Sequence, residues 1–265
     1  MTATVTADRS ALAWLLADSA ALAGRSIRHE LRSLDGLLVT VLLPVLILLA
    51  FVYIFGGALQ TPGRYLDYVV PGIVVLTTGY GAALTATALT QDLTTSTIDR
   101  LRSLPASPAA LFAGHVTAAL LRTLFSAMLV IVVAIALGFE AVTNPRAWLS
   151  AIGITTLYIL AIAWISVIVG VLARSVEAAS GFSFLVLFLP YLSSGFVPPE
   201  TLPPALQAVA ENQPLTPVIE TLRALLLGTE LGNHGWRAAG WCTAIIAVTI
   251  PTSAMLFRRR ASQPR

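Results

Sequence analysis

The sequence contains no lysine, because all 16 of its basic residues are arginine. No lysine is therefore available for a Walker A loop, a Schiff base or general-base catalysis. The single cysteine, Cys242, excludes an internal disulfide and a metal site built from paired cysteines. The three histidines are scattered, and the motifs HExxH, GxSxG and GxGxxG are absent. We therefore expect a chain that is not itself an enzyme and that holds no cofactor or metal.

Charge is also scarce. Only 11% of the 265 residues are charged, whereas 57% are hydrophobic and the mean hydropathy is +0.83. Soluble domains carry roughly 25% charged residues, so this balance indicates a membrane protein. A helix needs about 20 mostly apolar residues to cross the hydrocarbon. Six segments meet this standard, and they predict an all-α integral membrane protein with a transmembrane domain over residues 37–257: 37–57, 69–90, 111–138, 150–172, 180–197 and 240–257.

The arginines predict the orientation of these spans. With six spans both termini lie on one side of the membrane, and that side carries eleven arginines against four on the other. The positive-inside rule therefore places both termini in the cytoplasm of a multi-pass plasma-membrane protein. The cytoplasmic ends are then an N-terminal segment, residues 1–36, and a basic tail, residues 258–265.

Residues 10–35 predict an amphipathic helix ahead of the first span. Its leucines, alanines and Ile27 recur at three- and four-residue steps, and Arg25, Arg28 and Arg32 fall on the opposite face. Such a helix lies along the inner leaflet with its basic face toward the phospholipid headgroups. A helix packed on a soluble partner is the alternative interpretation.

A proline-rich external segment separates the fifth and sixth spans, with prolines at 198, 199, 203, 204, 214 and 217. The spacing of Leu202, Leu206 and Val209 predicts one short helix, and that of Val218 and Leu222 predicts another. Both are too short to cross the membrane, so we expect them to enter the outer leaflet and return, facing protein or water. The alternative is an ordinary external loop.

The segment between the second and third spans is short, polar and stopped by Pro105. Ile98, Leu101 and Leu104 recur every three residues, which places them on one face of a short helix. An apolar ridge flanked by charges suits docking into a groove of another protein. The alternative is a solvated loop whose arginines only set the topology.

Two ionisable residues, His115 and Arg122, lie inside the predicted spans, and no predicted span holds an Asp or Glu. Ion-driven transporters bury carboxylates or histidine chains along the transport path, so this pattern favours an external energy source. We expect His115 at the membrane interface. For Arg122, two interpretations remain: a side chain that reaches the inner headgroups, or a buried pairing role.

Two stretches, "IDRLRSLPASPAALFAG" and "SSGFVPPETLPPALQAVAENQPLTPVIETLRALLLG", resemble the permease subunits of type-2 ATP-binding-cassette (ABC) exporters, especially the daunorubicin-resistance-like branch. The six spans, the cytoplasmic termini and the interfacial helix are similar to that family's architecture. Ser96 stands where the family usually has a glycine, and "SPAAL" lacks the usual basic residue after the proline.

The resemblance implies roles for both stretches. The first corresponds to a coupling helix that docks on the ATP-binding subunit, and the second to outer re-entrant helices that gate the export path. The implied coupling residues are Ile98, Asp99, Arg100, Leu101, Arg102, Leu104 and Pro105, and the implied gate residues are Pro198, Pro199, Pro214, Pro217, Glu220 and Arg223.

The implied partners are two copies of an ATP-binding-cassette ATPase subunit, which carry ATP and Mg, together with a second permease subunit and membrane lipid. A nucleic-acid partner is not expected. The sequence leaves open a homodimer or a heterodimer, and a drug-like or lipid cargo, with a glycan less favoured. A non-transporting membrane anchor fits the docking ridge but not the proline-rich segment. A lipid-modifying enzyme would need an acid, metal or nucleophile cluster that the sequence lacks.

Overall fold

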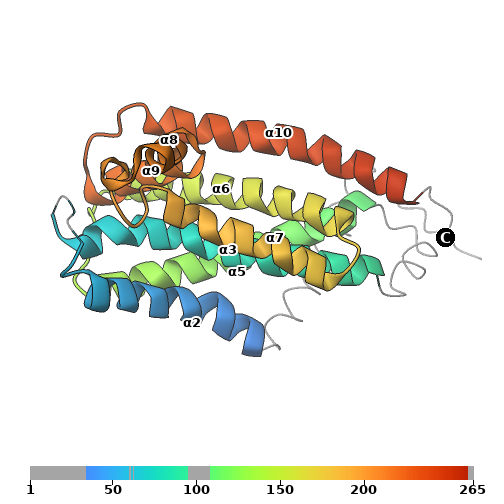
Figure 1. Ribbon diagram of the computed structural model, residues 1–265, viewed down its shortest axis with the longest axis horizontal. Helices are drawn as coiled ribbons and strands as arrows, with labels where there is room; N and C mark the ends of the chain where they lie inside the picture. Colours follow the sequence, from blue (N-terminus) through green and yellow to red (C-terminus); the bar gives the residue numbers. More distant parts are fainter. Residues whose placement is uncertain (1–33, 60, 62, 95–107, 262–265) are drawn as a thin grey trace, which may run out of the picture.

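The computed structural model describes residues 34–59, 61, 63–94 and 108–261, and every regular element within those ranges is a helix (Figure 1). The predicted all-α fold is therefore confirmed for the described chain. In order, the elements are α2 (Leu34–Ala50), a π-helical turn η1 (Phe51–Phe55), α3 (Tyr65–Thr94), α5 (Pro108–Ala136), α6 (Pro145–Leu172), α7 (Val176–Phe188), the 3-10 turns η2 (Leu189–Leu192) and η3 (Pro199–Thr201), α8 (Pro204–Asn212), α9 (Leu215–Leu227) and α10 (His234–Ala261).

Four of these helices, α3, α5, α6 and α10, are long and apolar enough to cross a membrane. They correspond to the second, third, fourth and sixth predicted spans. The first and fifth predicted spans appear as shorter apolar helices. Residues 37–57 form α2 followed by η1, and residues 180–197 form α7 followed by η2. Pro190 lies in η2, where the α-helix has already given way to a 3-10 turn, and residues 193–197 are not helical.

Several predicted boundaries were wrong by a few residues. The helix of the second span extends from Tyr65 to Thr94, so it contains Asp67 and Asp92, and the prediction that no span holds an acid was wrong. The last helix continues through Arg258–Arg260, residues that the sequence assigned to a separate tail. Hydropathy marks the hydrocarbon-length core of a helix, whereas backbone hydrogen bonding continues into its polar ends. The amphipathic helix expected at residues 10–35 lies outside the described residues, apart from the first two residues of α2.

The long helices run alternately up and down, which gives the bundle two distinct ends (Figure 1). One end carries α8 and α9, the start of α6 and the end of α5; we call it the α9 end. The other carries the end of α3, the start of α5 and the end of α10. α3 is the central helix, because 83% of its apolar stretch is buried, compared with 17% for α10. α10 packs on α6 and α9 and leaves most of its surface exposed.

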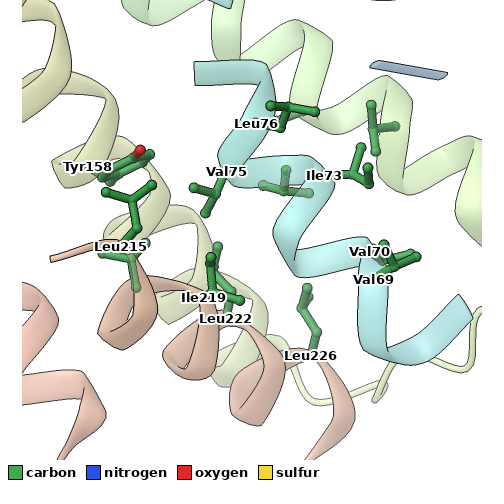
Figure 2. Packing of buried hydrophobic residues seen from close by; sticks show 14 of the residues in the cluster. Val69, Val70, Ile73, Val75, Leu76, Tyr158, Leu215, Ile219, Leu222 and Leu226 are labelled. Carbon is green, nitrogen blue, oxygen red and sulfur yellow. The ribbon is translucent and has the colours of Figure 1, made fainter. Parts of the chain in front are cut away.

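An apolar cluster joins α9 to the centre of the bundle (Figure 2). Leu215, Ile219, Leu222 and Leu226 recur along one face of α9 and are almost completely buried. They face Val75 and the neighbouring apolar residues of α3, together with Tyr158 of α6. α9 is therefore a packed helix of the core rather than an exposed loop.

Candidate functional site

Prolines define where the short helices at the α9 end begin. Pro199 opens η3 and Pro204 opens α8, each at the first helical position, where the missing N–H costs nothing. Pro214 caps α9, and Pro217 lies in its first turn. α9 then ends at Gly228, whose φ of 72° is in the left-handed region that favours glycine. The second helix that the spacing predicted is confirmed as α9, and the first is confirmed as α8, although Leu202 lies before its start.

The joint between α8 and α9 is fixed by a buried threonine. The Thr216 hydroxyl donates a hydrogen bond to the Ala210 carbonyl at 2.5 Å and accepts one from the Ser194 amide at 3.4 Å. The side-chain amide of Gln213 donates to the Leu192 carbonyl. These contacts tie the α8–α9 joint to the turn of residues 193–196 that follows η2. The segment is thereby held against the bundle by polar groups as well as by its leucines.

Arg223 holds the middle of α9 to two other parts of the chain. Its Nη2 donates hydrogen bonds to the Ser194 carbonyl at 2.7 Å and to the Tyr68 carbonyl at 3.0 Å. Its Nη1 donates to the Glu220 carboxylate one turn away, and the guanidinium lies 3.9 Å from the centroid of the Tyr68 ring. The side chain is only 12% exposed. The planar, forked guanidinium suits this combination of several acceptors and an aromatic face.

The turn that Arg223 contacts also touches α3 directly. A Cβ placed on Gly72 of α3 would lie 2.4 Å from the Gly195 carbonyl oxygen, so only glycine permits this approach of the two backbones. The Tyr65 hydroxyl donates to the Phe196 carbonyl at 3.1 Å, and the Phe196 ring stacks on Tyr191. α3, the turn at 193–196 and α9 therefore form one interlocked unit. We call it the outer clamp because the arginine distribution predicts that this end faces outward.

Arg122 lies between α5 and α3 and points into the bundle. Its Nη2 donates to the Gly81 carbonyl at 3.0 Å and to the Thr85 hydroxyl at 3.1 Å. Thr85 in turn donates to the same Gly81 carbonyl at 2.7 Å. Of the two interpretations that the sequence left open, the buried pairing role describes this geometry. A cation in hydrocarbon needs such acceptors, because the membrane supplies no water to replace them.

His115 contacts Asp92 nearer to the end of the bundle opposite α9. The His115 Nε2 lies 3.1 Å from the Asp92 Oδ2, and His115 is 9% exposed. The ring is buried between α3 and α5, and its expected position at the membrane interface stays a prediction. The hydropathy pattern predicted that the second span ends at residue 90. Asp92 lies beyond that boundary, so the sequence did not indicate it as a partner of His115. The histidine and arginine contacts together join α3 to α5 along their shared face.

The predicted coupling residues Ile98, Asp99, Arg100, Leu101, Arg102, Leu104 and Pro105 lie outside the described residues. The structure fixes only the ends of the two helices that flank them, at Thr94 and Pro108. The predicted gate residues are all described, and Glu220 and Arg223 are brought together with Tyr68 and Ser194. Sequence reasoning missed those two partners because Arg223 contacts their backbone carbonyls, which any residue type supplies.

Within the described part of the chain no group of three or more His, Cys, Asp or Glu side chains is placed to hold a metal ion. At the outer clamp the Nη atoms of Arg223 bond to carbonyls and to Glu220, whereas its Nε and the Ser194 hydroxyl are buried without a hydrogen-bond partner among the described residues. The arrangement holds the short helix α9 against one end of the bundle.

Four helices long and apolar enough to cross a membrane, packed in one bundle with short helices at one end, are the architecture of a multi-pass membrane protein. Comparison with known proteins supplies its class. The sequence profile of the ABC-2 type transporter family matches residues 19–227. The chain is 30% identical over 226 residues to the daunorubicin resistance ABC transporter permease protein DrrB1 of Streptomyces coeruleorubidus, which covers 83% of this chain and 78% of that relative. The chain therefore belongs to the ABC-2 type transporter family, and it is the transmembrane subunit of an ABC exporter. In this family the ATPase is a separate subunit.

Proposed function

We propose that this permease exports an amphipathic drug-like or lipid compound across the plasma membrane. It pairs with a second permease subunit, as a homodimer or a heterodimer, and with two copies of an ATPase subunit that bind ATP and Mg. The match to a drug-resistance permease over most of both chains carries the proposal. The scarcity of acids in the spans supports an external energy source, since Asp92 pairs with His115 near one end rather than lining a path of carboxylates.

The proposed topology has six spans, with α2–η1 and α7–η2 as the first and fifth. The α9 end then faces outward, and both termini are cytoplasmic. Cysteine labelling in intact cells tests this arrangement in a Cys242→Ser background. An impermeant thiol reagent should modify Asn212→Cys, which is exposed, and should not modify Ser262→Cys. Labelling of Ser262→Cys in intact cells contradicts the six-span topology.

In this topology the outer clamp is the external gate. α9 is short, its contacts to α3 and to the 193–196 turn are polar as well as apolar, and Arg223 provides a single point at which they meet. Release of Arg223 from Ser194 and Tyr68 frees α9 to tilt away from α3 without breaking any long helix. Prolines fix φ at the first residues of η3 and α8, so these two short helices keep their conformation during that motion.

The segment 98–105 is the proposed coupling helix. It joins the helices α3 and α5, which are tied to each other by the His115–Asp92 and Arg122–Thr85 contacts. A displacement of this segment by the ATPase therefore moves both helices together, and α3 carries Tyr68, which belongs to the outer clamp.

Replacing both Leu101 and Leu104 with alanine should leave the permease inserted and folded but should weaken co-purification of the ATPase. Each buried leucine contributes roughly 1.5–3 kcal/mol.

A transport assay tests the export function itself. The permease and its cognate ATPase are reconstituted into vesicles, and ATP-dependent accumulation of daunorubicin is compared with that of a fluorescent phospholipid. We expect accumulation of at least one of them, and none with a non-hydrolysable ATP analogue. ATP hydrolysis without movement of either compound favours the alternative function, a membrane anchor that recruits a cytoplasmic partner. Hydrolysis by the isolated permease contradicts the subunit assignment.

A further inference from the structure

The connection between α5 and α6, residues 137–144, contacts the end of α9 as well as its own two helices. The Val142 amide donates a hydrogen bond to the Leu226 carbonyl at 2.8 Å. Leu226 lies in the last turn of α9, where backbone carbonyls have no partner within the helix. The Val142 carbonyl accepts a hydrogen bond from the Trp148 indole N–H at 2.7 Å. The backbone of Val142 therefore links the C-terminal end of α9 to the start of α6.

The residue that ends α9 packs on the same valine. Gly228 has a φ of 72°, and a Cβ placed on it would lie 2.7 Å from the Val142 Cγ1. A side chain at Gly228 would therefore displace Val142. Gly232 also has a positive φ, of 51°, but a Cβ placed on it would meet no atom closer than 3.9 Å. Close contact with Val142, and not the backbone conformation alone, thus distinguishes Gly228.

The connection is itself attached to α5 and to the residue before α3. The Phe139 side chain is buried in the apolar core, and the Phe139 amide donates to the Ala134 carbonyl at 2.9 Å. Arg64 donates to the Gly138 carbonyl at 2.8 Å. Its ion pair with Glu140 is exposed and contributes little. The connection therefore gives the end of α9 a fixed support.

The N-terminal end of α9 is held to the preceding turn by single side chains instead. The Ser194 amide donates to the Thr216 hydroxyl at 3.4 Å, and the Gln213 side-chain amide donates to the Leu192 carbonyl. α8, which precedes this end, is mostly exposed, and Ala210 is its one buried residue. Each of these hydrogen bonds opens when one side chain rotates, whereas separation at Val142 requires two backbone segments to part. The two ends of α9 therefore differ in how they are attached.

We propose that the α5–α6 connection is the hinge of α9. When the outer clamp opens, α9 stays attached to Val142 through the Leu226 carbonyl and turns about that point. Its N-terminal end then moves away from the 193–196 turn and carries α8 with it. Trp148 is a positioning residue, because it holds the Val142 carbonyl. The use of the hinge in gating rests on the proposed function, whereas the hinge itself rests on the contacts described above.

Hydrogen–deuterium exchange at single amides tests the hinge in the full-length permease in lipid nanodiscs. Trp148→Phe keeps an aromatic ring but removes the N–H donor. It should accelerate exchange of the Val142 amide by roughly 2- to 10-fold, the effect of losing one neutral hydrogen bond, and should leave residues 219–222 unchanged. Arg223→Met should give the opposite pattern, with faster exchange at residues 219–222 and none of the change at Val142. Trp236→Phe, at an exposed tryptophan of α10, should alter neither region.

A glycine pair tests the contact of α9 with Val142 in a second way. Gly228→Ala forces a side chain against Val142 and should accelerate exchange of the Val142 amide. Gly232→Ala is the matched control, because it introduces a side chain at a positive φ without that contact. It should leave Val142 unchanged. Where Gly228→Ala fails to insert in the membrane, Trp148→Phe still decides the question.

Three outcomes overturn the proposal. Equal acceleration at Val142 and at residues 219–222 in Arg223→Met would show that α9 leaves the bundle as a whole, without a hinge. Equal acceleration of both regions in Trp148→Phe would indicate a general loss of stability. Unchanged Val142 exchange in Trp148→Phe and in Gly228→Ala would show that these contacts do not support the connection. Because the measurement needs no ATP, cargo or ATPase, its result is independent of the export assay.

Discussion

Arg223→Met should loosen α9 from the rest of the bundle while leaving the long helices intact. Methionine keeps the apolar stem but removes all the donors, so the hydrogen bonds to the Ser194 and Tyr68 carbonyls are lost together with the contact to the Tyr68 ring. Ser194 is fully buried, so its carbonyl is left without that donor in a place that water reaches poorly.

The magnitude follows from the two contacts that have no substitute. A hydrogen bond from a charged donor contributes about 1.5–3 kcal/mol, and a cation–π contact about 0.5–2 kcal/mol. Taking the bond to Ser194 and the contact with the Tyr68 ring, we expect the free energy of local opening of α9 to fall by about 2–5 kcal/mol. Since every 1.4 kcal/mol is a factor of ten, amide exchange in α9 should accelerate by roughly 30- to 4,000-fold.

Hydrogen–deuterium exchange with the permease in lipid nanodiscs measures this effect. Peptides from α9 and from residues 193–196 should exchange faster in Arg223→Met, whereas those from α5 should not change. Arg237→Met is the matched control, because Arg237 lies at the same end, is exposed and contacts the Glu211 carbonyl only at 3.5 Å. Arg223→Lys should be intermediate, since lysine keeps the charge but not the fork.

Two outcomes would refute this reasoning. Unchanged exchange in α9 of Arg223→Met would show that the apolar cluster alone holds the helix. An equal acceleration in Arg237→Met would show that the effect comes from loss of positive charge at that end rather than from the contacts of Arg223. If the outer clamp is the gate, the loosened variant should also increase passive release of loaded cargo from vesicles without ATP.

Two further predictions concern the packing of α3. Gly72→Ala should lower the melting temperature, because its Cβ would lie 2.4 Å from a backbone carbonyl and overpacking costs about 1–3 kcal/mol or more. Gly153→Ala has open space around its Cβ, so it should stabilise the helix by up to about 1 kcal/mol and raise the melting temperature slightly. Equal melting temperatures would contradict the close approach at Gly72. Thr85→Val should destabilise the permease by about 1–3 kcal/mol, because it removes an acceptor of the buried Arg122. Thr87→Val should do less, since the Thr87 hydroxyl contacts only carbonyls of its own helix, and a larger loss at Thr87 would contradict the pairing role.

The local features of the chain were predictable from the sequence. In a bilayer each spanning segment must satisfy its own backbone, so an apolar run of sufficient length becomes a helix whatever surrounds it. Hence the all-α class, the four long helices and the two shorter apolar ones follow from hydropathy. The short helices α8 and α9 follow from leucine spacing between prolines, which fix φ wherever they stand. The arginine distribution also predicts the orientation, which remains a prediction.

The contacts between helices were decided only by the tertiary structure. Arg223 bonds to carbonyls 29 and 155 residues away, and Arg122 to one 41 residues away; a carbonyl is the same in every residue, so no sequence pattern marks these acceptors. The pairing of His115 with Asp92 was hidden because hydropathy ends a span where polarity begins, although the helix continues. A cavity of about 440 Å³ between α5 and α6 at the α9 end was hidden for a related reason. Leucine, valine and methionine look alike in a sequence whether they face a neighbour, lipid or a void. The sequence determines which segments enter the membrane, because that depends on each segment's own transfer to lipid. Which faces meet depends on shape and on backbone atoms brought together from distant segments, and only the folded bundle defines them.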